Sequence, residues 1–167
     1  MGVAQTRASF EEYVRARTPA LSRIAYLVTG NAHDAEDLVQ SALEKAATRW
    51  QNLDDPEAYL RRVIYTKAIS RWRYLRARPA ETLTDAPPER PDETDHDTRL
   101  VLAAALRRLT PKQRAVLILR FYEDRTEVEA AIVLGVSTGT VKSQTRHALR
   151  RLREVAPELA ELTAVAR

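Results

Sequence analysis

Apolar residues recur every three or four positions through most of the chain, which is the period of an α-helix. Few segments alternate apolar and polar residues as a half-buried strand does. In the first half the pattern predicts four helices, at about 9–17, 19–30 and 31–50 and from 56 onward. In the second half it predicts helices at about 98–109 and 111–122, followed by a pair at 126–135 and 137–153. The expected fold is therefore all-α.

Local signals mark the ends of these helices. Pro19 and Pro56 stand at expected first helical positions, where the missing N–H costs nothing, and Gly30 is expected to end a helix. Three pairs have the spacing of a capping box, in which a hydroxyl and a longer polar side chain satisfy each other's backbone: Ser9 with Glu12, Thr110 with Gln113, and Thr126 with Glu129.

The last two predicted helices have the pattern of a helix-turn-helix. Such a motif needs a small residue where its helices cross, a flexible turn residue and an apolar anchor in the second helix. Ala131, Gly135 and Val141 supply these in order, and Ser137 can cap the second helix. From Val141 an inward stripe runs along that helix, and its remaining residues face outward: Lys142, Ser143, Gln144, Arg146, His147, Arg150 and Arg151. A basic face of this kind fits the major groove of DNA, although a solvated helical hairpin would show the same periodicity.

Residues 79–97 divide the chain. This segment contains four prolines and seven acidic residues, with Leu83 as its one large apolar residue. Such a composition cannot bury enough surface to offset the entropy of ordering, so we expect a flexible linker. The expected organisation is a helical domain over 1–78, the linker over 79–97 and a second helical domain over 98–167.

Composition narrows the class of protein further. The net charge is +4, and the chain has no cysteine, which fits a reducing cytoplasm and excludes disulfides and thiolate metal sites. The longest apolar run, 100–106, is far too short to span a membrane, so no membrane insertion is expected. His33, His96 and His147 lie in separate segments without metal-ligand spacing, which predicts no metal site, no cofactor and no enzyme activity.

Charge is unevenly distributed in the first half. Acidic Asp34, Glu36 and Asp37 lie near the start of one helix, where they also complement the helix dipole. Residues 59–78 contain no acid, and aromatic residues interleave with their cations, which suits single-stranded nucleic acid. Trp72 also lies on the apolar stripe and could equally be a core residue. The cations are Arg61, Arg62, Lys67, Arg71, Arg73, Arg76 and Arg78.

Four segments, taken in order, resemble the extracytoplasmic-function sigma factors of bacterial RNA polymerase. DAEDLVQ at 34–40 is similar to the polymerase-binding segment, and PEAYLRRVIYTKAISRWR at 56–73 is similar to the helix that reads and opens the −10 element. LRRLTPKQRAVLILRFYED at 106–124 resembles the start of the second domain. LGVSTGTVKSQTRHALRRLR at 134–153 resembles the helix-turn-helix that reads the −35 element.

The resemblance implies a specificity subunit that directs promoter recognition, DNA melting and initiation. Its implied partners are the β′ clamp helices of core polymerase, promoter DNA and, as in many members, an anti-sigma protein. The resemblance assigns polymerase binding to Asp34, Glu36, Asp37, Leu38 and Gln40. It assigns contact with the DNA of the −10 element to Arg61, Arg62, Tyr65, Lys67, Arg71 and Arg73. It assigns contact with the DNA of the −35 element to Ser137, Thr140, Lys142, Ser143, Arg146, His147 and Arg150.

The chain departs from the family pattern at several of these positions. Tyr65-Thr66 stands where many relatives have Arg-Asn, and His147 replaces a frequent arginine. The promoter sequences of relatives therefore do not transfer to this chain. Two other functions remain open at this stage: a helix-turn-helix repressor or activator that acts alone, and a helical adaptor or RNA-binding protein.

Overall fold

The computed structural model describes residues 7–77, 96–157 and 159, and the side chains from 102 onward in the second of these ranges. Within these residues every regular element is a helix, which confirms the all-α prediction. The first half contains α1 (Arg7–Thr29), α2 (Ala32–Arg49), the short η1 (Trp50–Asn52) and α3 (Pro56–Ala77). The second half contains α4 (His96–Arg107), α5 (Pro111–Leu117), η2 (Ile118–Tyr122), α6 (Glu127–Leu134) and α7 (Thr138–Val155).

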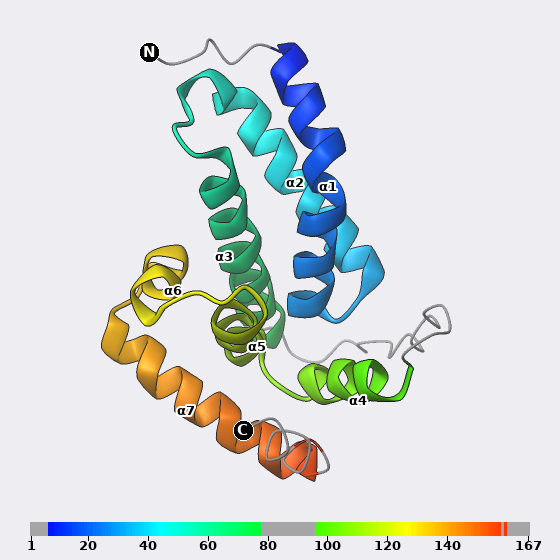
Figure 1. Ribbon diagram of the computed structural model, residues 1–167, viewed down its shortest axis with the longest axis vertical. Helices are drawn as coiled ribbons and strands as arrows, with labels where there is room; N and C mark the ends of the chain where they lie inside the picture. Colours follow the sequence, from blue (N-terminus) through cyan, green and yellow to red (C-terminus); the bar gives the residue numbers. More distant parts are fainter. Residues whose placement is uncertain (1–6, 78–95, 158, 160–167) are drawn as a thin grey trace.

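The first three long helices pack as a bundle in which α1 and α2 lie side by side and α3 follows them (Figure 1). Asn31 caps α2 by accepting a hydrogen bond from the Asp34 amide at 3.0 Å, and Asp55 caps α3 at the Ala58 amide, also at 3.0 Å. Gly30 has the left-handed φ of +73° that lets the chain turn between α1 and α2. The inward face of α2 carries Ala35, Leu38, Val39, Ala42 and Ala46, all of them buried.

The beginning of the chain differs from the prediction. The sequence signals predicted two helices before Gly30, but α1 is continuous and contains both Ser9 and Pro19. Ser9 is not a cap: its hydroxyl accepts a hydrogen bond from the Trp50 indole at 3.0 Å. Pro19 is exposed, and the hydroxyl of the preceding Thr18 donates to the Val14 carbonyl at 2.5 Å. The helix tolerates the missing proline N–H because packing of its buried face holds the residues before and after Pro19 in one helix.

The second half confirms the predicted helix-turn-helix. Both capping boxes, Thr110 with Gln113 and Thr126 with Glu129, are present with both of their hydrogen bonds. Gly135 ends α6 in the left-handed conformation, with φ of +65° and ψ of +38°. Ser137 caps α7 by accepting from the Thr140 amide at 3.1 Å, and Val141 is fully buried as the expected anchor.

One hydrophobic core joins the two halves. The main cluster contains Leu21 and Ile24 of α1, Leu60 and Ile64 of α3, and also Leu119 from the second half. Figure 1 shows α5 and α6 beside α3, which agrees with the shared cluster. A second cluster joins Leu106 of α4 and Leu109, which follows that helix, to Ala148 of α7. The predicted linker, 79–97, lies almost wholly outside the described residues.

Candidate nucleic-acid interface

The outer face of α7 is polar, basic and open to solvent. Val141 and Ala148 are fully buried on its inner face, so the helix cannot rotate without losing its anchor. The opposite face is thereby fixed outward, as the sequence pattern predicted. Its exposed side chains are Lys142, Ser143, Arg146, His147, Arg150 and Arg151, and Gln144 is half-buried.

Several of these side chains already have partners within the chain. Ser137 and Thr140 share a hydroxyl contact of 2.9 Å, which ties both to the helix cap. His147 Nδ1 lies 3.0 Å from Nη2 of Arg150, and because arginine only donates, the imidazole accepts there and carries its proton on Nε2. Lys142 Nζ lies 3.7 Å from a Glu127 carboxylate oxygen at the start of α6. This exposed pair is weak and can be exchanged for a phosphate.

The cations of α3 do not share one environment. Arg62 and Arg73 are exposed, and Arg71 is half exposed while pairing with Asp34 of α2 at 2.8 Å. Lys67 is partly buried and donates a hydrogen bond to Ser41. Burial, followed by repulsion from Lys45, lowers the pKa of Lys67. The exposed part of this face can bind phosphates. Arg62 and Arg73 suit this role, because they are exposed and form no ion pair among the described residues.

Arg61 and Tyr65 are covered in this structure. Tyr65 is fully buried, and the Arg61 side chain is only 15% exposed. Both contact Glu123, which follows η2: Arg61 Nε donates to one carboxylate oxygen at 2.5 Å, and the Tyr65 hydroxyl donates to the other at 2.9 Å. Burial and then the neighbouring Glu123 charge raise the pKa of Tyr65 above its ordinary value, so the phenol stays protonated as a donor. Sequence analysis did not identify Glu123, because no local pattern relates it to Arg61 and Tyr65 about sixty positions earlier.

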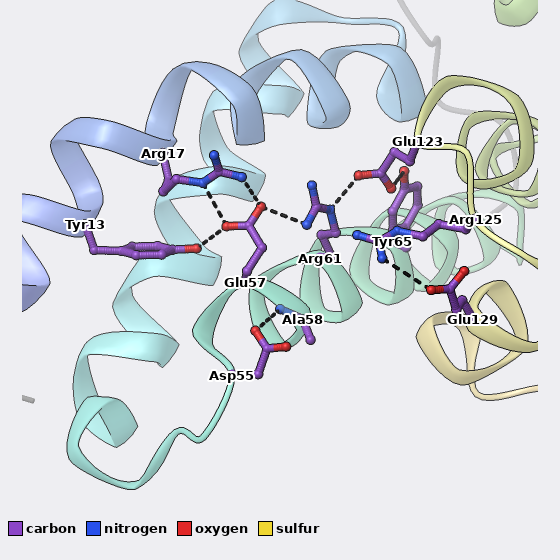
Figure 2. A network of polar contacts seen from close by, with 10 residues as sticks. All are labelled: Tyr13, Arg17, Asp55, Glu57, Ala58, Arg61, Tyr65, Glu123, Arg125 and Glu129. Atoms are coloured by element: carbon purple, nitrogen blue, oxygen red, sulfur yellow. Dashed lines mark hydrogen bonds and ion pairs between the residues drawn. The ribbon is translucent and has the colours of Figure 1, made fainter. Parts of the chain in front are cut away.

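The contact with Glu123 belongs to a longer network of polar side chains (Figure 2). Glu57 of α3 accepts hydrogen bonds from Tyr13 at 2.5 Å and from Arg17 Nε at 2.9 Å, and it pairs with Arg61 at 2.8 Å. Arg61 is thus shared between Glu57 and Glu123. The network connects α1, α3 and the second half through charge-assisted hydrogen bonds, which are the strong class.

The predicted polymerase-binding residues of α2 fall on two faces. Glu36, Asp37 and Gln40 are exposed and form an acidic and polar surface. Asp34 is engaged by Arg71, and Leu38 is only 7% exposed, so its side chain belongs to the core. Beside the exposed residues, α1 and α2 border a mainly apolar groove of about 660 Å³ that Phe10, Val39 and Leu43 help to line.

The described residues show no other chemical centre. Nowhere in 7–77 or 96–157 do three potential metal-ligating His, Cys, Asp or Glu side chains gather. No helix in the described part of the chain combines the length and apolar character that crossing a bilayer requires. The functional candidates are therefore the two basic helical faces and the acidic surface of α2.

Comparison with known proteins agrees with this arrangement. The family model for Sigma-70 region 2 matches residues 13–78, and the model for Sigma-70, region 4 matches residues 105–154. The RNA polymerase sigma-E factor of Streptomyces coelicolor is 43% identical over 151 residues, which are 87% of this chain and 84% of the relative. The ECF RNA polymerase sigma factor SigL of Mycobacterium tuberculosis is 34% identical, covering 93% of this chain and 91% of the relative.

Solved structures of sigma factors share the fold. The sigma factor RpoE bound to the anti-sigma factor NepR from Bartonella quintana superposes with a TM-score of 0.63 at 26% identity, covering 87% of this chain and 95% of that chain. CnrH in complex with the cytosolic domain of CnrY gives 0.59 at 25% identity, covering 90% and 88%. With both regions matched in order and extensive identity to named relatives, the chain belongs to the extracytoplasmic-function group of the sigma-70 family, the subunits that direct RNA polymerase to promoters.

Proposed function

We propose that this sigma factor divides promoter recognition between α3 and α7 and docks on core polymerase through the exposed face of α2. In this scheme α7 reads the −35 element as duplex, and α3 binds the −10 element and holds its separated strands. The chain itself catalyses no reaction; the polymerase with which it assembles does. Its place of action is the cytoplasm, where the polymerase meets the chromosome.

The single observation that carries the proposal is the position of the α7 cations. They extend from a helix fixed by a buried anchor and by a capped turn, so the side chains are presented at a set angle. A recognition helix meets base edges mainly through its N-terminal residues. Lys142, Ser143 and Arg146 are exposed on that part of α7, whereas Arg150 and Arg151 lie further along.

The −10 assignment rests on α3. Its cations Arg62, Arg71 and Arg73 are exposed, and they can contact the phosphate backbone. Tyr65 has an aromatic ring suited to stacking on an unpaired base, but it is buried in the present arrangement. Its use therefore requires a rearrangement.

Polymerase docking is assigned to Glu36, Asp37 and Gln40, because they are exposed acceptors on one rigid helix. Leu38 supports them from the core and is not expected to touch polymerase. Two of the solved relatives are complexes with anti-sigma proteins, NepR and CnrY. We extend this to an anti-sigma protein as a partner of this chain.

Charge reversal at Asp37 tests the docking assignment. Asp37→Arg should leave helicity nearly unchanged, because the side chain is exposed and the partner it has among the described residues, His33, is 3.6 Å away and also exposed. It should abolish co-purification with core polymerase. Glu12→Arg, a charge reversal at another exposed position, on α1, is the matched control and should co-purify normally. A folded Asp37→Arg chain that binds polymerase as the wild type does would contradict the assignment.

The alternative of a self-sufficient DNA-binding regulator has a different signature. Such a protein would bind its site without polymerase, and it usually needs a dimer interface for useful affinity. Transcription from a promoter library with core polymerase, with and without this chain, separates the two functions. Polymerase-dependent initiation supports the sigma assignment, and site-specific binding by the chain alone would overturn it.

A further inference from the structure

An ion pair between Asp34 of α2 and Arg71 of α3 connects two residues that the family resemblance assigned to different partners. The resemblance placed Asp34 with polymerase and Arg71 with the −10 element. In the structure Nη2 of Arg71 lies 2.8 Å from Oδ1 of Asp34, and the side chains are 47% and 34% exposed. A carboxylate assigned to polymerase is therefore already paired with a cation proposed to contact DNA.

Both members of this pair extend from backbone that is held in place. The Asp34 amide donates a hydrogen bond of 3.0 Å to the Asn31 side chain that caps α2, and a helix N-terminus favours a negative charge. The next residue, Ala35, is buried in the core. On α3, Ala68 is buried about one turn before Arg71. The Asp34 carboxylate is thus a fixed anchor beside Arg71.

The contact with Asp34 occupies one end of the Arg71 guanidinium. An arginine side chain has five N–H donors in a planar fork, and Nη2 is the nitrogen that meets Asp34. Arg71 has no other hydrogen bond or ion pair among the described residues. The remaining donors suffice for a phosphate, which a guanidinium can bind through two parallel hydrogen bonds. A side chain that is already anchored also loses less rotational freedom when DNA binds.

We propose that Asp34 is a positioning residue of the −10 DNA site: it holds the Arg71 guanidinium in the orientation that meets a DNA phosphate, and it is not a polymerase contact. The inference rests on the proposed function of α3 and adds Asp34 to it. Polymerase docking stays with the other exposed residues of α2, Glu36, Asp37 and Gln40.

A purely electrostatic role and a positioning role for Asp34 predict opposite effects on DNA binding. A carboxylate beside a phosphate repels DNA and offsets the charge of Arg71, so on charge alone its removal should tighten binding. Salt screens such repulsion over about 8 Å at physiological ionic strength, whereas it does not replace the orientation of a contacting guanidinium. If Asp34 positions Arg71, its removal should weaken binding. The direction of the change therefore distinguishes the two roles.

The experiment compares Asp34→Asn with Glu12→Gln in the full chain. Both changes remove one carboxylate charge, and Glu12 is an exposed residue of α1. Each chain is assembled with saturating core polymerase. Fluorescence anisotropy then measures binding to a single-stranded oligonucleotide that carries the −10 sequence of a promoter selected by the wild-type holoenzyme. Affinity for core polymerase is measured separately, and circular dichroism reports folding.

Asp34→Asn should weaken oligonucleotide binding by about two- to fivefold, the effect expected for loss of one exposed ion pair, and leave the affinity for core polymerase unchanged. Asp34→Glu, which keeps a carboxylate, should restore most of the binding. In an Arg71→Ala chain, Asp34→Asn should have no further effect, because no guanidinium remains to be positioned. Glu12→Gln should behave as the wild type in both measurements.

Three outcomes would overturn the positioning role. Unchanged or tighter oligonucleotide binding by a folded Asp34→Asn chain would do so, and so would an equal loss in the Arg71→Ala chain, since a merely structural role would persist there. Weaker binding to core polymerase with unchanged oligonucleotide affinity would return Asp34 to the docking surface. A wild-type holoenzyme that does not bind the oligonucleotide would contradict the proposed function of α3 itself, and the inference would fall with it.

Discussion

At the scale of single residues, the carboxylate of Glu57 has partners on two helices. It accepts from Tyr13 and Arg17 and pairs with Arg61, although its side chain is 23% exposed. Burial alone would raise its pKa, but the hydrogen bonds from Arg17 and Tyr13 and the charge of Arg61 outweigh burial and lower it. Tyr13 responds in the opposite direction: burial and the Glu57 carboxylate raise its pKa.

The lowered pKa of Glu57 predicts how stability depends on pH. A group whose pKa is lower in the folded state contributes stability above its unfolded value and loses it as pH falls through the folded value. For Glu57 the contribution should be complete above the ordinary glutamate value of 4.5 and should decline below it. Glu57→Gln should therefore be less stable than the wild type at pH 7, and the difference should shrink at lower pH. Urea unfolding at a series of pH values measures this, and a constant difference would contradict it.

Arg114 is a buried cation without a counter-charge. It is 7% exposed, its Nε has no hydrogen-bond partner, and no carboxylate among the described residues pairs with it. Desolvation lowers its pKa to about 10, so it remains charged at neutral pH. Arg114→Met, which keeps much of the volume, should leave the free energy of unfolding unchanged or raise it by about 1–3 kcal/mol. Arg114→Lys keeps the charge and should give no gain; a loss above about 2 kcal/mol in the Met variant would mean that the cation is stabilising.

At the scale of elements, prediction from sequence succeeded where the cause is local. A capping box, a left-handed glycine and the spacing of apolar residues each act within a few positions, and Thr126 with Glu129, Gly135 and Val141 behave as expected. Pro19 was misread because a local break signal was overridden by packing of the whole α1 face against α2 and α3.

The same limit applies to the candidate site: features set by neighbouring residues were predictable from the sequence, and long-range contacts were not. The outward face of α7 follows from periodicity, since the inner stripe fixes its orientation. Tyr65 and Leu38 were assigned to DNA and polymerase binding through the resemblance, yet their side chains are buried, because motif matching names positions without stating what covers them. Glu123 lies 58 positions after Tyr65, and no pattern in the sequence pairs the two.

Pro19 gives a test of how strongly packing holds α1. A proline within a helix removes one backbone hydrogen bond and crowds the carbonyl of the residue four positions earlier, here Arg15. Pro19 is exposed, so alanine should restore the bond without disturbing the core. Pro19→Ala should raise the free energy of unfolding by roughly 1–3 kcal/mol in urea titration. A decrease would show that proline stabilises a bend on which the packing depends.

The recognition helix should separate base reading from phosphate binding along its length. Arg146→Ala should cost about 1–3 kcal/mol at particular −35 positions and change the preferred sequence. Arg150→Ala should weaken all promoters about equally and reduce the salt dependence by roughly one unit of slope. Promoter selection with each mutant holoenzyme measures both effects. Equal weakening of every −35 sequence by Arg146→Ala would assign that residue to the backbone instead.

At the scale of the whole molecule, the two halves pack around one shared hydrophobic core and are not two separate cores joined by a linker. The main hydrophobic cluster includes residues from α1, α2 and α3 together with Ala115, Ile118 and Leu119. Two domains with separate cores would unfold independently, whereas a shared core makes the unfolding of one half expose the apolar surface of the other.

The shared core predicts one cooperative transition for the free chain. In calorimetry the van 't Hoff and calorimetric enthalpies should agree, and far-UV and near-UV circular dichroism should give the same midpoint. Two resolved transitions in the wild type would show that the halves fold separately.

The shared core also has a consequence for the order in which the chain is made. Tyr65 leaves the ribosome 58 residues before Glu123, which at about 5–20 residues per second is a delay of roughly 3–12 s. During that interval α1, α2 and α3 can assemble, but Tyr65 and its apolar neighbours have nothing to cover them. The nascent first half therefore passes through a stage in which the surface around Tyr65, which we propose binds DNA, is more accessible than it is in the complete protein. Any chaperone or partner that binds this surface has its best opportunity before translation ends.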